Sequence, residues 1–146
     1  MKILGIDEAG RGCVIGPLVM CGYLIDESKM KELKKMGVKD SKLLTAKKRS
    51  EIKEKIEKIA DDFILLKVSA REIDKLRTVS NLNKIEIEQM QHIINLLQPD
   101  RAIVDAIEAN EKRFHQKLMA RLNGTEVIAE NFADKKYPVV GAASIL

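Results

Sequence analysis

An apolar N-terminal segment that runs directly into two adjacent carboxylates limits the folds open to this chain. Residues 2–8 have the pattern of a short buried strand that ends in Asp7 and Glu8. In the Gly-Arg-Gly sequence at 10–12, the glycines allow a close backbone approach to a ligand and the arginine suits a phosphate. Carboxylates in a half-buried position are costly unless a cation offsets their charge. The segment therefore predicts a metal site beside a phosphate site, built on a strand.

Hydrophobic periodicity and turn residues divide the rest of the chain into further strands and helices. Strands are predicted at 13–25, with a bulge near Gly16-Pro17, and at 63–68, 101–105 and 125–129. Helices are predicted at 46–60 after a Thr45 N-cap, at 70–76, from an Asn81 cap to residue 97, at 111–122, and from Pro138 onward. A strand meander followed by strand–helix–strand crossovers predicts one α/β domain with a five-stranded mixed sheet flanked by helices.

Acidic residues recur at the ends of these strands: Asp7 with Glu8, then Asp105, then Asp134. Strand ends collect at one edge of an α/β sheet, and we expect the first and fourth strands to be neighbours. Carboxylates that meet there repel one another unless they hold divalent cations, and oxygen ligands favour Mg²⁺ or Mn²⁺. Taken singly, a strand-end aspartate is more often a cap or turn residue. In a regular strand Glu8 also points away from the face of Asp7, so it needs a bulge or its longer side chain to join.

Charge and composition narrow the classes of protein further. The formal net charge is +4, but residues 29–58 hold twelve basic and five acidic side chains. Such a sector suits an enzyme that grips a polyanion, and it equally suits a solvated lysine-rich face. No Cys-x-x-Cys pair, signal segment or long apolar span is present, so we expect a reduced, cytoplasmic protein without a membrane anchor. His92 and His115 are interpreted as surface residues.

The motifs, in this order, resemble type 2 ribonuclease H (ribonuclease HII), nearest to its archaeal and eukaryotic forms. The resemblance covers nearly the whole chain. It rests on residues 7–12 followed by Gly16-Pro17, the Asp-Ser-Lys segment within 38–45, Asn81-Leu82-Asn83 with Glu86, Val104-Asp105, Ala133-Asp134, and residues 137–145.

The resemblance implies an RNase H-like fold and an activity. The activity is cleavage of the RNA strand of RNA–DNA hybrids and incision 5′ to ribonucleotides embedded in duplex DNA, leaving 5′-phosphate and 3′-hydroxyl ends. Carried over by position, the catalytic and metal-holding residues for two Mg²⁺ or Mn²⁺ ions are Asp7, Glu8, Asp105 and Asp134. The ribose 2′-hydroxyl is read by Gly10, Arg11 and Gly12, and the substrate phosphates lie against Asp40, Ser41 and Lys42. We expect a monomer whose catalytic domain spans residues 1–146.

Three positions depart from the family pattern. Phe132 stands where the family usually has lysine, Asn131 where histidine is common, and Gly141 where a small serine or alanine is usual. The family also continues with helices that supply a sugar-stacking tyrosine, and the apolar residues 139–146 end without a C-cap. We therefore expect a chain without the family's C-terminal segment. The alternatives are an inactive or weakly active nucleic-acid-binding domain, or another nuclease of the same fold.

Overall fold

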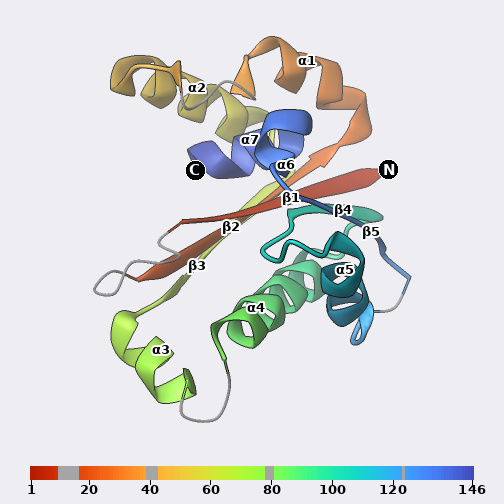
Figure 1. Ribbon diagram of the computed structural model, residues 1–146. Helices are drawn as coiled ribbons and strands as arrows, with labels where there is room; N and C mark the ends of the chain where they lie inside the picture. The colour runs from red at the N-terminus through yellow and green to blue at the C-terminus, as the bar shows by residue number, and fades with distance from the viewer. Residues whose placement is uncertain (10–16, 39–42, 78–80, 123) are drawn as a thin grey trace.

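Apolar side chains that alternate along the strands build a five-stranded sheet with helices on both faces (Figure 1). The computed structural model describes residues 1–9, 17–38, 43–77, 81–122 and 124–146. The strands are β1 (Lys2–Ala9), β2 (Leu18–Asp26), β3 (Asp62–Val68), β4 (Arg101–Asp105) and β5 (Glu126–Glu130). Their order in the sheet is β3-β2-β1-β4-β5. The pairs β1–β2 and β2–β3 are antiparallel, whereas β1–β4 and β4–β5 are parallel. The predicted mixed sheet, with its first and fourth strands as neighbours, is confirmed.

The helices form two layers, one above and one below the sheet in Figure 1. The upper layer contains the short helix η1 (Glu27–Lys29), α1 (Met30–Lys35), α2 (Ala46–Ile59), α6 (Ala133–Lys136) and α7 (Pro138–Ile145). The lower layer contains α3 (Ala70–Arg77), α4 (Leu82–Leu97) and α5 (Glu111–Met119). Each layer covers its own core. Along β1, Ile3 packs into the core under α2 and α7, and Leu4 and Ile6 pack into the core over α4 and α5.

Local hydrogen bonds fix the beginnings of the two longest helices. Thr45 Oγ1 accepts from the amide of Lys48 at 3.2 Å, and Asn81 Oδ1 accepts from the amide of Lys84 at 2.8 Å. Both predicted N-caps are therefore confirmed. They work because each side chain satisfies an amide that the first helical turn leaves without an intrahelical partner.

The structure differs from the sequence-based expectation at several boundaries. The second strand was expected from residue 13 with a bulge near Gly16-Pro17, but residues 13–16 lie outside the described part of the chain; as described, the strand begins at Leu18 and pairs with β1 without interruption. The fifth helix ends at Met119 rather than at 122. Neither α1 nor α6 was expected. Leu33 is the one fully buried residue of α1, and α6 is a single turn, so neither shows a helical hydrophobic period.

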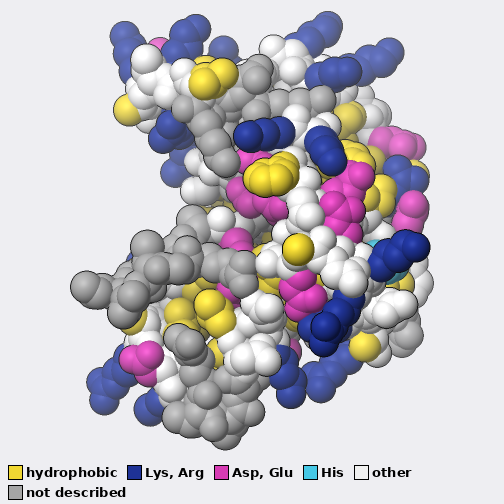
Figure 2. All heavy atoms as spheres, viewed as in Figure 1, with side chains coloured by type: hydrophobic (Ala, Val, Ile, Leu, Met, Phe, Trp, Pro, Cys, Tyr) yellow, Lys and Arg dark blue, Asp and Glu magenta, His cyan; other side chains and the backbone are white. Residues whose placement is uncertain are grey.

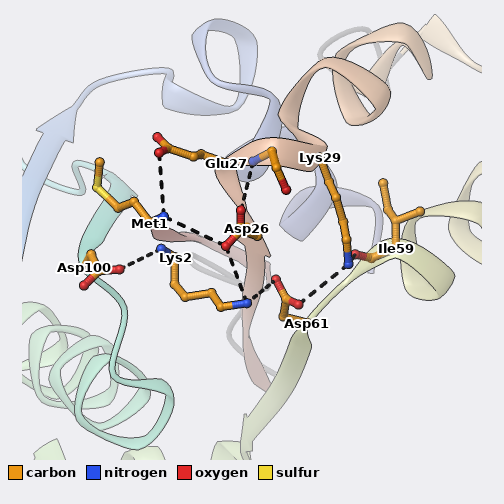
Figure 3. A network of polar contacts seen from close by, with 9 residues as sticks. Met1, Lys2, Asp26, Glu27, Lys29, Ile59, Asp61 and Asp100 are labelled. Carbon is orange, nitrogen blue, oxygen red and sulfur yellow. Dashed lines mark hydrogen bonds and ion pairs between the residues drawn. The ribbon is translucent and has the colours of Figure 1, made fainter.

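An ion-pair network ties the start of β1 to the elements around it (Figure 3). Lys2 Nζ lies 3.1 Å from Asp61 Oδ2 and 3.7 Å from Asp26 Oδ2, and the backbone amide of Lys2 donates to Asp100 Oδ2 at 2.7 Å. The N-terminal ammonium lies 3.6 Å from a carboxylate oxygen of Glu27. These contacts join the start of β1 to the end of β2, the approach to β3 and the approach to β4.

Among the described helices, none has the length and apolar character needed to cross a membrane.

Candidate active site

Two of the predicted acids end neighbouring parallel strands. Strands β1 and β4 pair in register as far as Ile6 with Val104, so the next residues, Asp7 and Asp105, reach the same edge of the sheet side by side. Asp134 comes to this edge from α6, which directly follows β5, and its side chain is buried with 7% of its surface exposed. The parallel half of the sheet thus gathers acids that are distant in sequence.

The four predicted acids line one pocket of about 310 Å³. We call it the carboxylate pocket. Its described lining is Asp7, Glu8, Asp105 and Asp134, with Val19, Cys21, Leu65, Ala143, Ser144 and Leu146. Among the described residues, no three Asp, Glu, His or Cys side chains are grouped closely enough to hold a metal ion. The pocket therefore brings the acids onto shared walls, and their metal-binding and catalytic roles are a prediction.

Glu8 joins this pocket without a bulge. The pairing of β1 with β2 runs without interruption from Lys2 to Ala9 and places Glu8 opposite Met20, a residue of the core over α4 and α5. Glu8 nevertheless lines the carboxylate pocket. Of the two routes left open by the sequence, the longer side chain is the one that the described strand supports.

The environment of Asp7 disfavours its charge. Burial raises the pKa of the Asp7 carboxyl to about 6, and the charges of Asp105 and Asp134 add to the rise. Hydrogen bonds from the Glu8 amide and the Ser144 side chain act in the opposite direction. The protein thus holds a carboxylate in place while leaving its charge poorly compensated, which is the condition that a bound cation relieves.

Helix α7 reaches Asp7 because two glycines allow close packing. A Cβ atom on Gly5 would overlap the backbone of Val139 in α7. A Cβ on Gly141 would lie 2.7 Å from the carbonyl oxygen of Val38. The absence of a side chain at Gly141, one of the three departures from the family pattern, thus fits its tight contact. The close approach brings Ser144 to the carboxylate of Asp7. Sequence reasoning gave Ser144 no role, although it is the one polar side chain in α7.

The other two departures lie in the turn between β5 and α6. Phe132 adopts a left-handed conformation (φ 59°, ψ 37°), and its amide donates to Asp105 Oδ1 at 3.0 Å. The amide of Asn131 donates to Glu111 Oε1 at 3.0 Å. The backbone of this turn therefore holds Asp105 directly and anchors the segment that carries Asp134.

The other predicted site residues and the largest described pocket lie away from the acids or outside the described residues. The predicted substrate-binding residues lie outside the described part of the chain: Gly10, Arg11, Gly12, Asp40, Ser41 and Lys42. A larger pocket of about 380 Å³ lies between α4 and α5, and Glu88 is the one acid in its described lining. We place the site at the carboxylate pocket, because acids converge there and not between the helices. His115 binds the carbonyl of Val127 through Nε2, in keeping with a structural role.

The family model and relatives that are 42–48% identical point to one family. The family model described as Ribonuclease HII matches residues 4–146. Ribonuclease HII of Methanothermobacter thermautotrophicus is 48% identical over 147 residues, which cover 100% of this chain and 71% of that protein. The structure of ribonuclease HII from Archaeoglobus fulgidus, in its complex with PCNA, superposes with a TM-score of 0.91 at 42% identity and covers 99% of this chain and 70% of that one. The ribonuclease H2 structure from Pyrococcus horikoshii OT3 gives 0.90 at 42% identity, with 99% and 69% covered.

Proposed function

The chain belongs to the ribonuclease HII family, and we propose that it is a metal-dependent endoribonuclease that cuts the RNA strand of RNA–DNA hybrids. We further propose that it incises 5′ to single ribonucleotides embedded in duplex DNA and leaves 5′-phosphate and 3′-hydroxyl ends. The observation that carries the proposal is the convergence of Asp7, Glu8, Asp105 and Asp134 on one pocket, in a chain that the family model matches almost throughout.

The carboxylate pocket fits divalent cations by its donor chemistry. Its four acids offer only oxygen ligands, which suits Mg²⁺ or Mn²⁺. Burial, with smaller contributions from the charges of Asp105 and Asp134, raises the pKa of Asp7, and this supports a cation as the compensating group. Two such ions, held by Asp7, Glu8, Asp105 and Asp134, would supply an activated water and stabilise the leaving oxygen of a phosphodiester.

The protein's own residues hold these ligands in position. Ser144 and the Glu8 amide bind the carboxylate of Asp7, and the Phe132 amide binds that of Asp105. Apolar side chains of Val19, Leu65 and Leu146 line the same pocket. Fixed ligands of this kind reduce the rearrangement needed at the moment of reaction.

Substrate recognition is proposed for two segments outside the described residues. Gly10, Arg11 and Gly12 would contact the ribose 2′-hydroxyl, the group that separates RNA from DNA at a given position. Asp40, Ser41 and Lys42 would lie against the phosphates. The support for both assignments is the match of their sequence to the family's motifs, together with the end of β1 in the carboxylate pocket immediately before residue 10.

The test is cleavage of a labelled DNA duplex that carries one ribonucleotide, beside an all-DNA duplex of the same sequence. With Mg²⁺ or Mn²⁺ we expect a single cut 5′ to the ribonucleotide, no cut in the all-DNA duplex, and no cut in EDTA. Asp7→Asn should abolish cleavage. Asp74→Asn, a matched change of an exposed acid in α3, should leave it intact.

Other outcomes would identify other functions. Equal cleavage by the wild type and Asp7→Asn, or equal cleavage of both duplexes, would overturn the proposal. Binding of a hybrid without cleavage would indicate a nucleic-acid-binding domain, for which the basic sector of α1 and α2 provides the observation. Cuts mapped away from the ribonucleotide would indicate a different nuclease of this fold.

A further inference from the structure

Phe132 is the most exposed aromatic residue in the described part of the chain. Its side chain is 66% exposed, compared with 39% for Phe63, and Tyr23 and Phe114 are fully buried. Its amide lies 3.0 Å from Asp105 Oδ1, and Asp134 follows two residues later. Phe132 thus carries an exposed ring on the turn whose backbone holds Asp105 and leads to Asp134.

The backbone at Phe132 does not account for this ring. Of the described non-glycine residues, only Phe132 and Gln98 have a positive φ, a conformation that bulky side chains avoid. The turn needs the left-handed backbone because it directs the amide to Asp105, but glycine or asparagine would adopt it with less strain. The hydrogen bond requires only a main-chain N–H. The phenyl ring therefore needs a separate explanation.

A cation accompanies the ring. Lys135 Nζ lies over Phe132, 5.6 Å from the ring centroid, and both Lys135 and its neighbour Lys136 are exposed. An aromatic face beside an ammonium group matches a nucleotide, because the ring can pack against a base or sugar while the cation meets the phosphate.

We propose that Phe132 and Lys135 form a binding contact for one nucleotide of the substrate strand, next to the phosphate that is cut. The proposal rests on the nuclease function proposed above and adds a positioning contact to it. Phe132 packs against a base or sugar and raises affinity, and it takes no part in the chemical step. Lys135 holds the adjoining phosphate.

The experiment compares three variants on the duplex that carries one ribonucleotide. Phe132→Asn removes the ring, keeps the amide and relaxes the left-handed backbone. Phe132→Trp keeps an aromatic face. Phe63→Asn is the control, since it removes another exposed aromatic, from β3. We expect Phe132→Asn to raise KM about tenfold with kcat within about twofold of wild type. Phe132→Trp should keep KM near the wild-type value, and Phe63→Asn should not change KM.

A second readout does not depend on turnover. A fluorescent 2-aminopurine base is moved position by position along the strand, and binding is measured in EDTA. The wild type should quench one position next to the ribonucleotide, Phe132→Trp should quench it too, and Phe132→Asn should not. A purely structural role for Phe132 predicts the opposite: kcat and thermal stability change, with quenching unaltered, and that result overturns the inference.

The two proposals fail in distinguishable ways. If the wild type cuts and binds the duplex and Phe132→Asn matches it in both KM and quenching, the nucleotide contact is wrong and the nuclease function stands. If the wild type binds with site-specific quenching but does not cut, the contact stands and the nuclease function is wrong. If the wild type neither binds nor cuts, both are wrong.

Discussion

Among single residues, Asp7 shows most directly how the fold prepares a site. It follows the buried residues Ile3–Ile6 of β1, so its carboxylate loses water on the side of the protein. Asp105 and Asp134 add negative charge on the other side. The chain could relieve this with a lysine or arginine, but the described lining of the carboxylate pocket contains none. A carboxylate kept at this disadvantage supports the proposal that a divalent cation binds here.

Asp7→Asn should stabilise the metal-free protein at neutral pH. The pKa of the carboxyl is about 6 in the folded chain and 3.8 in the unfolded one, so the folded state holds its proton to higher pH. Ionisation therefore lowers stability progressively from about pH 4 and fully above about pH 6, by at most ~3 kcal/mol. Asparagine removes that penalty. We expect urea unfolding in EDTA to show a gain of about 1–3 kcal/mol at pH 7 and little gain at pH 4.

The pH dependence separates charge from packing in this variant. Asp74→Asn, in which an exposed acid of α3 is replaced, should have little effect at either pH. A gain for Asp7→Asn that is the same at pH 4 and pH 7 would show that the side chain's shape, and not its ionisation, was responsible. A loss at pH 7 would mean that the Ser144 hydrogen bond depends on the ionised form and outweighs the burial.

At the scale of elements, the helices and strands that could be predicted are those that the local sequence determines. Thr45 and Asn81 correctly predicted the starts of α2 and α4, because an N-cap needs only a side chain and an amide three residues away. The strand that ends in Asp105 was equally predictable, since its apolar run is short and ends in an acid. Placing Asp7 and Asp105 at one edge required only that the first and fourth strands be neighbours.

The elements that escaped prediction depend on contacts between distant parts of the chain. Helix α6 is one turn long and begins from a left-handed phenylalanine, which no periodicity signals. The place of α7 is decided by its contact with Gly5, so the partnership of Ser144 with Asp7 could not be seen from the helix sequence alone. The convergence of the four acids on one pocket was therefore predictable from the sequence, and the groups that hold Asp7 and Asp105 were not.

Gly5→Ala should displace α7 from β1. The new Cβ would overlap the backbone of Val139, which cannot move without shifting the helix. We expect a loss of about 3 kcal/mol or failure to fold, together with loss of activity, measured by urea unfolding and cleavage. Gly22→Ala is the matched control. Its Cβ would lie 2.6 Å from Cγ2 of Ile93, a side-chain atom that can shift, so the cost should be smaller, about 1–2 kcal/mol. Equal losses in the two variants would contradict this account of the contact.

In the whole molecule, an ion-pair network and the candidate site lie at opposite ends of β1. The ion-pair network of Lys2, Asp26 and Asp61 surrounds the start of β1, and the carboxylate pocket lies at the end of the same strand (Figures 1 and 3). Basic side chains gather along the upper edge in Figure 2, over α1 and α2. Helix α2 spans both regions. The carbonyl of its last residue, Ile59, accepts a hydrogen bond from Nζ of Lys29. The charge of Lys53 acts to lower the pKa of Cys21, which lines the carboxylate pocket.

This arrangement predicts that lysines on α2 differ in their contribution to substrate binding. Lys53 is exposed. Burial and the charge of Asp7 raise the pKa of Cys21 to about 12, and the charge of Lys53 acts in the opposite direction. Lys53 is therefore close enough to act on a residue of the carboxylate pocket. Lys58 lies in the last turn, toward the ion-pair network. Lys53→Ala should weaken hybrid binding and reduce the slope of log K against log salt by about 1, as expected for one lost phosphate contact. Lys58→Ala should change neither. If the two variants reduce affinity and slope equally, the substrate is held by the diffuse charge of the basic sector and not by a path from α2 to the acids.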